Sequence, residues 1–324
     1  MSEDGYVARV EVGSRLHFGF LDLSVSGERI YGSLGVGIDK PQLTIRSAPH
    51  NDVEVEAPPE VLETAESYAR TSVEQFGVEG VSLSVDEMIP RHVGLGSGTR
   101  LALGVAAAVS RSYELEPDFR DIAPELGRAR RSGVGVSTFL DGGFVVDAGH
   151  PAETFSTPEE RGVPETVLTT ELRPDWKWVV AVPGYSESPS GEREEILMNQ
   201  VVDGEGDGIS DKVSEILSRN VLPGVNSGKI ELFGSGIQEI DRINGERFED
   251  QQDGVYAEPE LVDLGRSLDE VYAAGQSSWG PSVYMLTRKE TVDTVVEYIE
   301  ENGSVDADIQ VCSTDESGYR SALI

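Results

Sequence analysis

Arginine and histidine side chains in this chain gather beside glycines, in three separate segments. The segments hold Arg15 and His17, then Arg91, His92 and Arg100, then Arg128, Arg130 and Arg131. The chain carries 59 acidic residues against 26 lysines and arginines, so clusters of cations are unusual in it. Arginine forms paired hydrogen bonds with phosphate and carboxylate oxygens. The three clusters therefore predict a site for a multiply charged anion.

The centre of that site is expected in residues 90–100, Pro-Arg-His-Val-Gly-Leu-Gly-Ser-Gly-Thr-Arg. Residues 81–85 alternate apolar and polar side chains, as a half-buried strand does, and residues 101–109 are apolar on every face, as in a buried helix. A glycine-rich turn between a strand and a helix lets backbone N–H groups point at an anion. We expect the anion to contact Arg91, His92, Gly94, Gly96, Ser97, Gly98 and Thr99.

Arg100 strengthens this interpretation. It would stand in the first turn of the helix, where a cation is disfavoured by roughly 0.3–1 kcal/mol unless an anion lies close. A plain turn between a strand and a helix is the alternative. Two familiar phosphate loops are excluded, because a dinucleotide fingerprint would need a third glycine at Thr99 and a Walker loop would need a lysine before Ser or Thr.

Two further side chains could move a proton or hold a metal. His17 follows a strand-like segment and could face a cleft as a general base, with a buried structural histidine as the alternative. Asp141 follows the third arginine cluster, and this combination suggests phosphate contact together with metal or general-base chemistry. For any single arginine of that cluster, a solvated loop is the alternative.

The rest of the chain must supply the elements that position these residues. Periodicity predicts strands at residues 6–12, 42–46, 81–85, 144–147, 176–183, 283–286 and 309–312. It predicts helices at residues 58–76, 101–109, 118–127, 192–201, 209–221, 229–248, 259–274 and 291–301. Residues 27–37 are expected to form a glycine-rich loop. The polar segment 151–174 indicates a connection, which divides the chain into a unit at 1–174 and a small α+β unit at 175–324.

Composition limits the classes of partner. No apolar run reaches the roughly 18 residues that span a bilayer, and the acidic residues 1–5 lack a signal-peptide pattern. The single cysteine, Cys312, excludes a disulfide within the chain and a cysteine zinc site. The net charge of −33 argues against nucleic-acid binding and indicates adaptation to a salt-rich cytosol. We therefore expect a cytoplasmic globular protein that binds neither nucleic acid nor membrane.

Four stretches of the chain together resemble one family. Pro90 and residues 94–97 match the second motif of the GHMP kinase superfamily, Pro-x-x-x-Gly-Leu-Gly-Ser-Ser-Ala, while Gly98 and Thr99 replace the usual Ser-Ala. With residues 14–19, 127–144 and 276–281, this loop resembles the β-ribofuranosylaminobenzene 5′-phosphate synthase family of that superfamily, in an acidic form of haloarchaeal type.

The resemblance implies an α+β fold with two domains and a site in the cleft between them. The N-terminal domain would resemble the second domain of ribosomal protein S5, and the C-terminal domain would be ferredoxin-like. The implied reaction joins phosphoribosyl pyrophosphate to 4-hydroxybenzoate or 4-aminobenzoate and releases carbon dioxide and pyrophosphate, in tetrahydromethanopterin-type cofactor biosynthesis. Mg²⁺ is the expected cofactor, with no organic cofactor, and a homodimer is expected.

The same resemblance implies a role for each group. N–H groups of residues 94–99, with Arg91 or Arg100, would stabilise the departing pyrophosphate, and His17 would deprotonate the phenol. Asp22 or Asp141 would hold Mg²⁺. The 5′-phosphate and the carboxylate would be held by Arg15, Arg130 and Arg131, with Ser277 and Ser278 donating from the facing domain. Ser14 and Gly280 complete the expected site.

Two rival functions remain open on this fold. An ATP-dependent small-molecule kinase often carries an aspartate after a Ser-Gly-hydrophobic triplet, but here residues 132–134 are followed by Gly135. Homoserine kinase-like members work without that base, so its absence does not exclude a kinase. A non-catalytic ligand-binding protein is the second rival, and the presence of all three cationic clusters argues against it.

Overall fold

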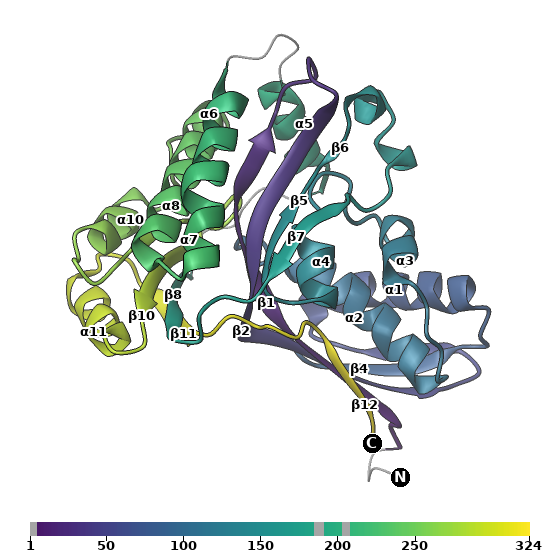
Figure 1. Cartoon of the computed structure of the whole chain (residues 1–324). Helices are drawn as coiled ribbons and strands as arrows, with labels where there is room; N and C mark the ends of the chain where they lie inside the picture. The colour runs from purple at the N-terminus through teal and green to yellow at the C-terminus, as the bar shows by residue number, and fades with distance from the viewer. Residues whose placement is uncertain (1–4, 185–190, 203–207) are drawn as a thin grey trace.

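The computed structural model describes residues 5–184, 191–202 and 208–324. It contains two β-sheets with helices packed against both (Figure 1). Most of residues 1–5, where the sequence predicts an acidic start without a signal-peptide pattern, lie outside the described residues. Among the helices within the described ranges, none combines the length and the apolar character needed to cross a membrane.

The first sheet is built on a long antiparallel pair of strands, β1 (Ala8–Asp22) and β2 (Arg29–Pro49). The strand order is β12-β1-β2-β4-β3, with β5 and β6 paired to β2 and β7 paired to β5. The bounds are β3 (Val53–Glu56), β4 (Val81–Glu87), β5 (Phe144–Asp147), β6 (His150–Pro151), β7 (Thr166–Thr170) and β12 (Arg320–Leu323). Because β1 continues to residue 22, a strand carries Arg15 and His17.

The glycine-rich segment 27–37 forms the start of β2, so the prediction of a loop there is wrong. Gly35 in this segment serves close packing rather than a turn. A Cβ atom on Gly35 would lie 2.3 Å from the carbonyl oxygen of Leu16 and 2.6 Å from Cγ1 of Val134. Helix α4 (Val134–Leu140) can therefore lie directly against the strand.

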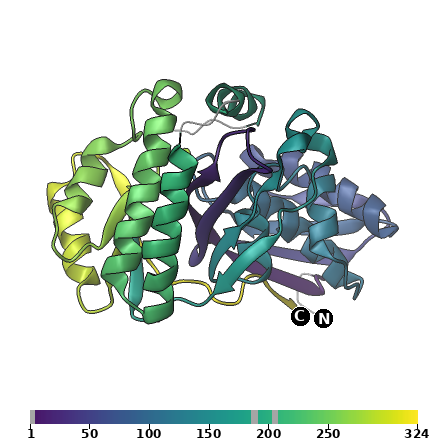
Figure 2. The ribbon, with the colours of Figure 1, turned by 45° about the horizontal axis from the view of Figure 1, so that its top comes forward.

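Helices of the first half of the chain pack on one face of this sheet (Figure 2). Besides α4 they are α1 (Pro59–Phe76), α2 (Ser97–Ser112) and α3 (Phe119–Glu125), followed by 3₁₀ turns at Ala152–Ser156 and Pro158–Glu160. Helix α2 is buried on nearly every face, as its apolar sequence predicts. A side chain at Gly104 would collide with Leu43, since its Cβ atom would lie 2.6 Å from Cδ2.

The second sheet has the strand order β11-β8-β10-β9, with antiparallel neighbours. Its strands are β8 (Trp176–Pro183), β9 (Ala273–Gln276), β10 (Val283–Arg288) and β11 (Ala307–Cys312). The order is thus 4-1-3-2 in chain sequence, the predicted ferredoxin-like arrangement. The helices are α5 (Gly191–Val201), α6 (Ile209–Ile216), a π-helical turn (Leu217–Val221), α7 (Leu222–Ser227), α8 (Ile230–Arg247), α9 (Glu249–Gln252), α10 (Pro259–Arg266) and α11 (Val292–Asn302).

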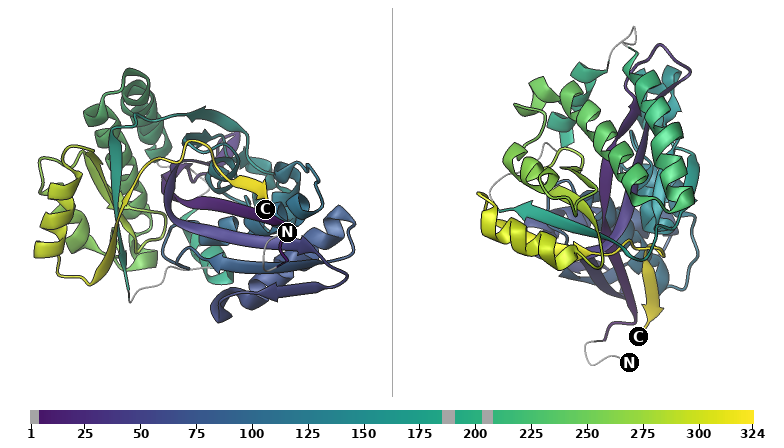
Figure 3. Two further views of the ribbon diagram at one scale, coloured as in Figure 1. Left: turned by 90° about the horizontal axis from the view of Figure 1, so that it is seen from below. Right: turned by 60° about the vertical axis from the view of Figure 1, so that its left-hand side comes forward.

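One continuous apolar core joins the two sheets. The ring of Phe18 on β1 stacks on Trp178 of β8 at 5.6 Å between centroids, and meets Tyr284 of β10 edge-on at 5.0 Å. Strand β12, near the C-terminus, returns to pair with β1 of the first sheet (Figure 3). Residues after 174 therefore contribute to both sheets, and the division of the chain at 174/175 stays a prediction.

Three predicted segments differ from the observed elements. The helix expected at 259–274 ends at Arg266, and residues 273–276 form β9. Strand β7 lies within the segment expected as a plain connection. Helix α4 was not predicted, because its β-branched residues and Gly135 have low helix propensity. It is stabilised by packing on β2 and α2 instead.

Candidate active site

Three segments that are far apart in the sequence meet where the sheets join: strand β1, the glycine-rich loop 90–96 and the turn 277–282. The hydroxyl of Ser277 links all three, because it donates to the carbonyl of Gly94 (2.7 Å) and accepts from the amide of His17 (3.1 Å). Further backbone hydrogen bonds run from Arg15 to Leu95, from Ser278 to His17 and from Ser282 to Val93. The loop is therefore fixed by its backbone, and its free N–H groups remain available.

Two glycines determine the course of the loop. Gly94 and Gly96 adopt φ angles of 82° and 79°, in the left-handed region that favours glycine. A Cβ atom on Gly94 would lie 2.1 Å from the carbonyl oxygen of Ser277. Gly96 is the N-cap of α2, and no side chain of the described residues caps that helix. The helix start therefore offers unpaired N–H groups, the arrangement that binds anions.

A cleft of about 1150 Å³ lies in front of this helix start. The loop, the first turn of α2, residues 127–135 and residues 155–161 contribute to its walls. Among the described residues, the walls carry no acidic side chain and six arginines, which are Arg15, Arg91, Arg128, Arg130, Arg131 and Arg161. In a chain with a net charge of −33, this cleft is a local concentration of positive charge.

Neighbouring groups hold two of these arginines at the wall. Arg128 donates to the hydroxyl of Tyr68, and its Nη1 would lie only 3.0 Å from a Cβ atom on Gly98. Arg161 is 5% exposed and donates to the carbonyl of Arg130 (2.7 Å). The Nη2 atom of Arg161 is buried without a hydrogen-bond partner. A buried donor without a partner is costly, so an anionic ligand in the cleft would relieve it.

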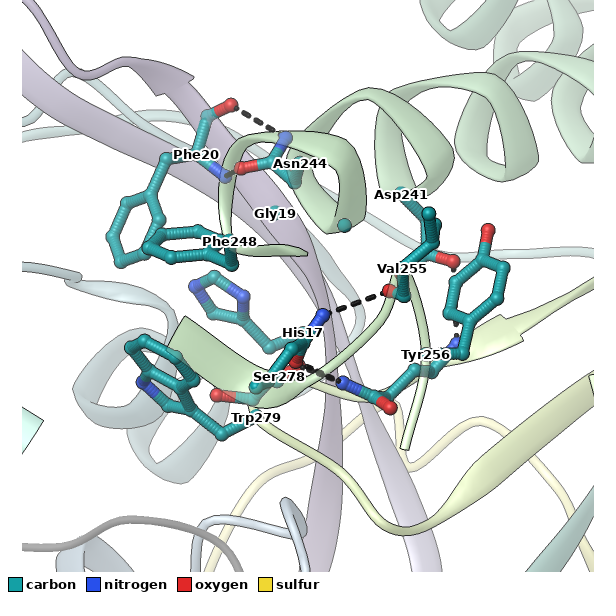
Figure 4. Close-up of a pocket in the computed structure, with 13 residues that line it drawn as sticks. His17, Gly19, Phe20, Asp241, Asn244, Phe248, Val255, Tyr256, Ser278 and Trp279 are labelled. Atoms are coloured by element: carbon teal, nitrogen blue, oxygen red, sulfur yellow. Dashed lines mark hydrogen bonds between the residues drawn. The ribbon is translucent and has the colours of Figure 1, made fainter. Parts of the chain in front are cut away.

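A second and smaller pocket joins the cleft beside β1. The two share His17, Phe20, Ser278 and Trp279. Figure 4 shows the rings of Phe20, Phe248 and Trp279 gathered around His17, while Asp241 and Tyr256 lie at the other end. The Phe248 and Trp279 rings are 4.7 Å apart. The pocket holds only about 30 Å³ of free space as it stands. Its aromatic walls and polar end match the chemistry of a flat ring with a polar substituent, but such a ring enters only if these side chains move apart.

Burial acts in opposite directions on the pKa values of His17 and Asp241 in this pocket. His17 is 4% exposed, and burial together with the charge of Arg15 lowers its pKa to about 3. Asp241 is 6% exposed, and burial raises its pKa to about 8, although the amide of Gln276 and the charge of Arg266 oppose the shift. His17 is therefore uncharged at neutral pH. The structure does not support His17 as the general base, because a base works best with a pKa near the ambient pH.

Most of the predicted site residues do line the cleft. These are Arg15, His17, Arg91, His92, Gly94, Gly96, Ser97, Gly98, Thr99, Arg130, Arg131 and Ser278. Gly135, which stands where a kinase could carry its aspartate, lines the cleft as well. A Cβ atom there would lie 3.3 Å from the side chain of Thr99, so this position has little room for a larger residue.

Arg100 does not reach the cleft, which corrects the sequence-based prediction. Its side chain is 1% exposed and points into the first half of the molecule. It donates to the carbonyls of Gly13 (2.8 Å), Ser14 (3.1 Å) and Gly135 (2.5 Å) and to the hydroxyl of Thr138 (3.0 Å). These acceptors replace the anion that was expected beside the helix start. Arg100 therefore ties α2 to β1 and α4.

Asp141 and Asp22 also lie away from both pockets. Asp141 is 45% exposed and pairs with Arg120 at 3.0 Å. Asp22 accepts hydrogen bonds from the amide of Ser24 (2.8 Å) and the hydroxyl of Ser210 (2.5 Å). Within the described ranges, no group of three His, Cys, Asp or Glu side chains is placed to hold a metal ion. Asp22 and Asp141 are therefore not placed to hold Mg²⁺ in the cleft, and the cofactor itself stays a prediction.

Three small residues of the predicted site serve the framework. The hydroxyl of Ser14 is buried against the carbonyl of Pro41 (2.5 Å). Ser277 is fully buried in the junction between the sheets. Gly280 has a φ of 66°, and a Cβ atom there would lie 2.6 Å from the side chain of Gln276. We assign none of them to ligand contact.

Sequence reasoning missed two charged residues of the pockets. Arg161 lies in the segment that was interpreted as a connection, although an arginine there in so acidic a chain was a usable signal. Asp241 lies within a predicted helix, and nothing in the sequence distinguishes it from the other 58 acidic residues. The aromatic walls from Phe248 and Trp279 were missed for the same reason, since helix and turn periodicity does not show which residues share a pocket.

Comparisons with known proteins agree with this geometry. A family model for the GHMP kinases N terminal domain matches residues 61–143. Beta-ribofuranosylphenol 5'-phosphate synthase from Methanothermobacter thermautotrophicus is 30% identical, over 86% of this chain and 88% of that protein. The proteins of the same name from Archaeoglobus fulgidus and Methanocaldococcus jannaschii are 30% and 25% identical, over 86% and 96% of this chain and 87% and 99% of their own length.

Solved structures show the same fold. Homoserine kinase from Cytophaga hutchinsonii superposes with a TM-score of 0.69 at 15% identity, and covers 99% of both chains. Mevalonate diphosphate decarboxylase from Staphylococcus aureus superposes with a TM-score of 0.65 at 13% identity, over 98% of both chains. At this identity the likeness concerns the fold alone, and it confirms the predicted two-domain GHMP architecture.

Proposed function

Because the chain belongs to the beta-ribofuranosylphenol 5'-phosphate synthase family, we propose that it joins phosphoribosyl pyrophosphate to 4-hydroxybenzoate. A bond forms between C1 of the ribose and the ring carbon that bears the carboxylate, while pyrophosphate and carbon dioxide leave. The protein is thus a decarboxylating phosphoribosyl transferase. The relatives' name specifies a phenol, which favours 4-hydroxybenzoate over 4-aminobenzoate as the acceptor.

The observation that carries this proposal is the wall of the cleft, which among the described residues holds six arginines and no acidic side chain. Phosphoribosyl pyrophosphate has an anionic group at each end of one sugar, so it needs two sets of cationic contacts. We assign the pyrophosphate to the N–H groups at the start of α2 and to Arg128, which lies beside Gly98. Charge develops on the departing pyrophosphate, and fixed N–H donors stabilise such charge. The 5′-phosphate is assigned to Arg130, Arg131 and Arg161.

The aromatic acceptor is assigned to the smaller pocket. Its walls are aromatic, and it opens into the cleft along the shared residues His17, Phe20, Ser278 and Trp279. A ring that enters this pocket can present one carbon to the ribose in the cleft. The uncharged ring of His17 stands at the point where the two substrates would meet, and the Nδ1 atom of His17 is buried without a partner.

Mg²⁺ and the cellular setting belong to the proposal as well. Since Asp22 and Asp141 do not line the cleft, no residue is assigned to Mg²⁺, and the ion is supplied with the donor in the assay. The net charge of −33 motivates a salt-rich cytoplasm as the working environment, and equal thermal stability in low salt and in multimolar KCl would contradict it. We further propose that the protein is a homodimer, which light scattering in high salt tests. We also propose that its product serves tetrahydromethanopterin-type cofactor synthesis.

One assay tests the reaction. The protein in multimolar KCl receives Mg²⁺, phosphoribosyl pyrophosphate and 4-hydroxybenzoate labelled in the carboxyl carbon. We expect labelled carbon dioxide and pyrophosphate in equal amounts, and slower turnover with 4-aminobenzoate. Parallel reactions with ATP and small alcohols serve as the control for a kinase. Phosphorylation of an alcohol without any release of carbon dioxide would overturn the proposal.

A further inference from the structure

A single acidic side chain lines the two pockets among the described residues, and it is Asp241 of α8. It lies in the smaller pocket, at the end opposite the aromatic rings around His17 (Figure 4). The chain has 59 acidic residues, so the exclusion of all but one from these walls is informative. A buried carboxylate in an aromatic pocket costs free energy, which suggests that it serves a purpose other than stability.

Groups from four directions face Asp241. The amide of Gln276 on β9 donates to Oδ2 (3.2 Å), and the hydroxyl of Tyr256 also donates to the carboxylate. Arg266 on α10 donates to the hydroxyl of Tyr256 at 2.6 Å, and the charge of ionised Tyr256 acts on Arg242. The hydroxyl of Tyr284 on β10 is buried nearby without a partner.

Space for the carboxylate is made by a glycine. A Cβ atom on Gly275 would lie 2.1 Å from Oδ2 of Asp241 and 2.8 Å from the hydroxyl oxygen of Tyr284. The pocket end is thus a compact polar cluster of one acid and two tyrosines. Such a cluster can accept a proton from a ligand and spread the resulting change of charge through Tyr256 to Arg266.

The orientation of the acceptor directs its hydroxyl to this cluster. In 4-hydroxybenzoate the hydroxyl and the carboxylate stand on opposite carbons of the ring. The carbon bearing the carboxylate must face the ribose in the cleft, so the hydroxyl points to the far end of the smaller pocket. We propose that Asp241 accepts the proton of this ring hydroxyl, an inference that rests on the proposed function.

The proton transfer balances over the reaction. Asp241 takes the hydroxyl proton, and the electrons of the O–H bond move into the ring. The opposite ring carbon bonds to C1 of the ribose, and pyrophosphate leaves with the electron pair of its C–O bond. The resulting dienone loses carbon dioxide, and the electrons of that C–C bond restore the ring and return the oxygen to a phenolate. Asp241 then gives the proton back.

The electrostatics of the pocket favour Asp241 over His17 for this task. Burial raises the pKa of Asp241 to about 8, whereas burial and the charge of Arg15 lower the pKa of His17 to about 3. A group with a pKa near the ambient pH is both available as a base and strong enough to act. Removing a positioned base typically costs about 10²–10⁴-fold in rate.

The test compares Asp241→Asn with the wild type on two acceptors, 4-hydroxybenzoate and 3,5-difluoro-4-hydroxybenzoate, whose hydroxyl ionises at lower pH. We expect kcat of the variant to fall about 10²–10⁴-fold with 4-hydroxybenzoate. The loss should be at least about tenfold smaller with the difluoro compound, because it needs less help to ionise. Asp147→Asn is the matched control, since Asp147 is a fully buried carboxylate that lines neither pocket. Its loss should be the same for both acceptors.

The pH profile gives a second readout if the asparagine variant does not fold. In the wild type kcat should rise between pH 6 and 9 as Asp241 ionises. The hydroxyl of Tyr256 lowers the pKa of Asp241, so Tyr256→Phe should move this rise to higher pH. A loss of kcat in Asp241→Asn that is equal for both acceptors would overturn this inference and leave the proposed function standing. A pH profile of kcat that is not shifted in Tyr256→Phe would do the same. Absence of carbon dioxide release by the wild type would overturn the proposed function and this inference with it.

Discussion

The cleft and the smaller pocket meet at His17, yet they are built for opposite tasks. The cleft comes mainly from the first half of the chain and offers arginines and backbone N–H groups without a described acidic side chain. The smaller pocket comes largely from the second half and offers aromatic rings at one end and one buried carboxyl group at the other. The cleft can attract any compact polyanion by charge, whereas the pocket can distinguish ligands by shape and by a single proton. If the acceptor binds in the smaller pocket as proposed, specificity for it resides in the second half of the molecule.

The largest loss of activity is expected for a change at Gly94, because both the cleft and the smaller pocket depend on the position of this glycine. Gly94→Ala would place a Cβ atom 2.1 Å from the carbonyl oxygen of Ser277 and would hold alanine at a φ of 82°. The backbone conformation alone costs about 1–2 kcal/mol, and the collision moves the loop away from β1. We expect kcat/KM to fall at least about 100-fold, because small displacements of positioning groups have effects of this size.

Gly275, which lies beside the smaller pocket, provides the matched comparison for Gly94. Gly275→Ala would press on the carboxylate of Asp241 rather than on backbone, so the protein should fold and the KM for phosphoribosyl pyrophosphate should change little. Gly275→Ala should instead lower kcat for the reaction of the benzoate. Steady-state kinetics with each substrate varied in turn measure both variants. Identical patterns for the two variants would show that cleft and pocket are not separate functional units.

Arg100→Met tests whether this arginine, the most buried one among the residues whose burial is described, belongs to the framework or to the cleft. The substitution leaves the carbonyls of Gly13, Ser14 and Gly135 without their donor. Each buried acceptor left unpaired costs about 1–3 kcal/mol, so the free energy of unfolding should fall by about 3 kcal/mol or more. Chemical denaturation in high salt measures it.

The control for this variant is an arginine on the surface. Arg120 pairs with Asp141 while both side chains are more than a third exposed, and Arg120→Met should cost less than about 1 kcal/mol. If Arg100→Met were as stable as Arg120→Met but bound the donor much more weakly, Arg100 would belong to the cleft after all.

Arg128→Ala tests the cleft itself. Loss of one charged hydrogen bond to phosphate costs about 1.5–3 kcal/mol, so the KM for phosphoribosyl pyrophosphate should rise about 10–100-fold. The KM for 4-hydroxybenzoate should stay nearly constant. Arg91→Ala is the comparison, because Arg91 lines the same cleft but donates to the carbonyl of Glu60. We expect a smaller rise for Arg91→Ala, and equal rises in both KM values of Arg128→Ala would contradict the assignment of the donor.

The contrast between the two regions also explains what the sequence can predict. Gly94, Gly96 and the arginines of the cleft are recognisable because left-handed glycines and clustered cations are rare in so acidic a chain. Arg100 misled the prediction, since its acceptors come from β1 and α4, which approach α2 only in the folded molecule. The sequence could not identify Asp241 as a pocket residue for a similar reason. One acid on an amphipathic helix becomes special only when β9, α10 and Tyr256 enclose it.

The strand predictions divide along the same line. The two sheets follow from alternating segments such as 81–85 and 176–183, where local pattern and burial agree. The start of β2 does not follow from such a pattern, because Gly35 is required by the closeness of Val134 on α4. Close packing between distant segments is a tertiary property. A local sequence pattern can therefore locate a strand or helix of this fold, but it does not show why a glycine is required where two distant segments pack closely.

The smallest expected effects concern the free energy of unfolding, whose dependence on pH should be opposite for His17 and for Asp241. The pKa of histidine is about 6.5 in an unfolded chain, and that of His17 is about 3 in the fold. Between these values the unfolded chain binds more protons, so the stability contributed by an uncharged His17 is lost as the pH falls from about 6.5 to 3. For Asp241 the folded pKa of about 8 lies above the ordinary value of 3.8, so the folded chain binds more protons and stability is lost as the pH rises through that window.

His17→Gln should therefore stabilise the protein relative to the wild type more at pH 5 than at pH 8, and Asp241→Asn more at pH 8 than at pH 5. Each slope is at most about 1.4 kcal/mol per pH unit. Denaturant unfolding at constant high salt between pH 5 and 8 measures both. Parallel slopes in the two variants would mean that burial in the smaller pocket does not act in opposite directions on His17 and Asp241.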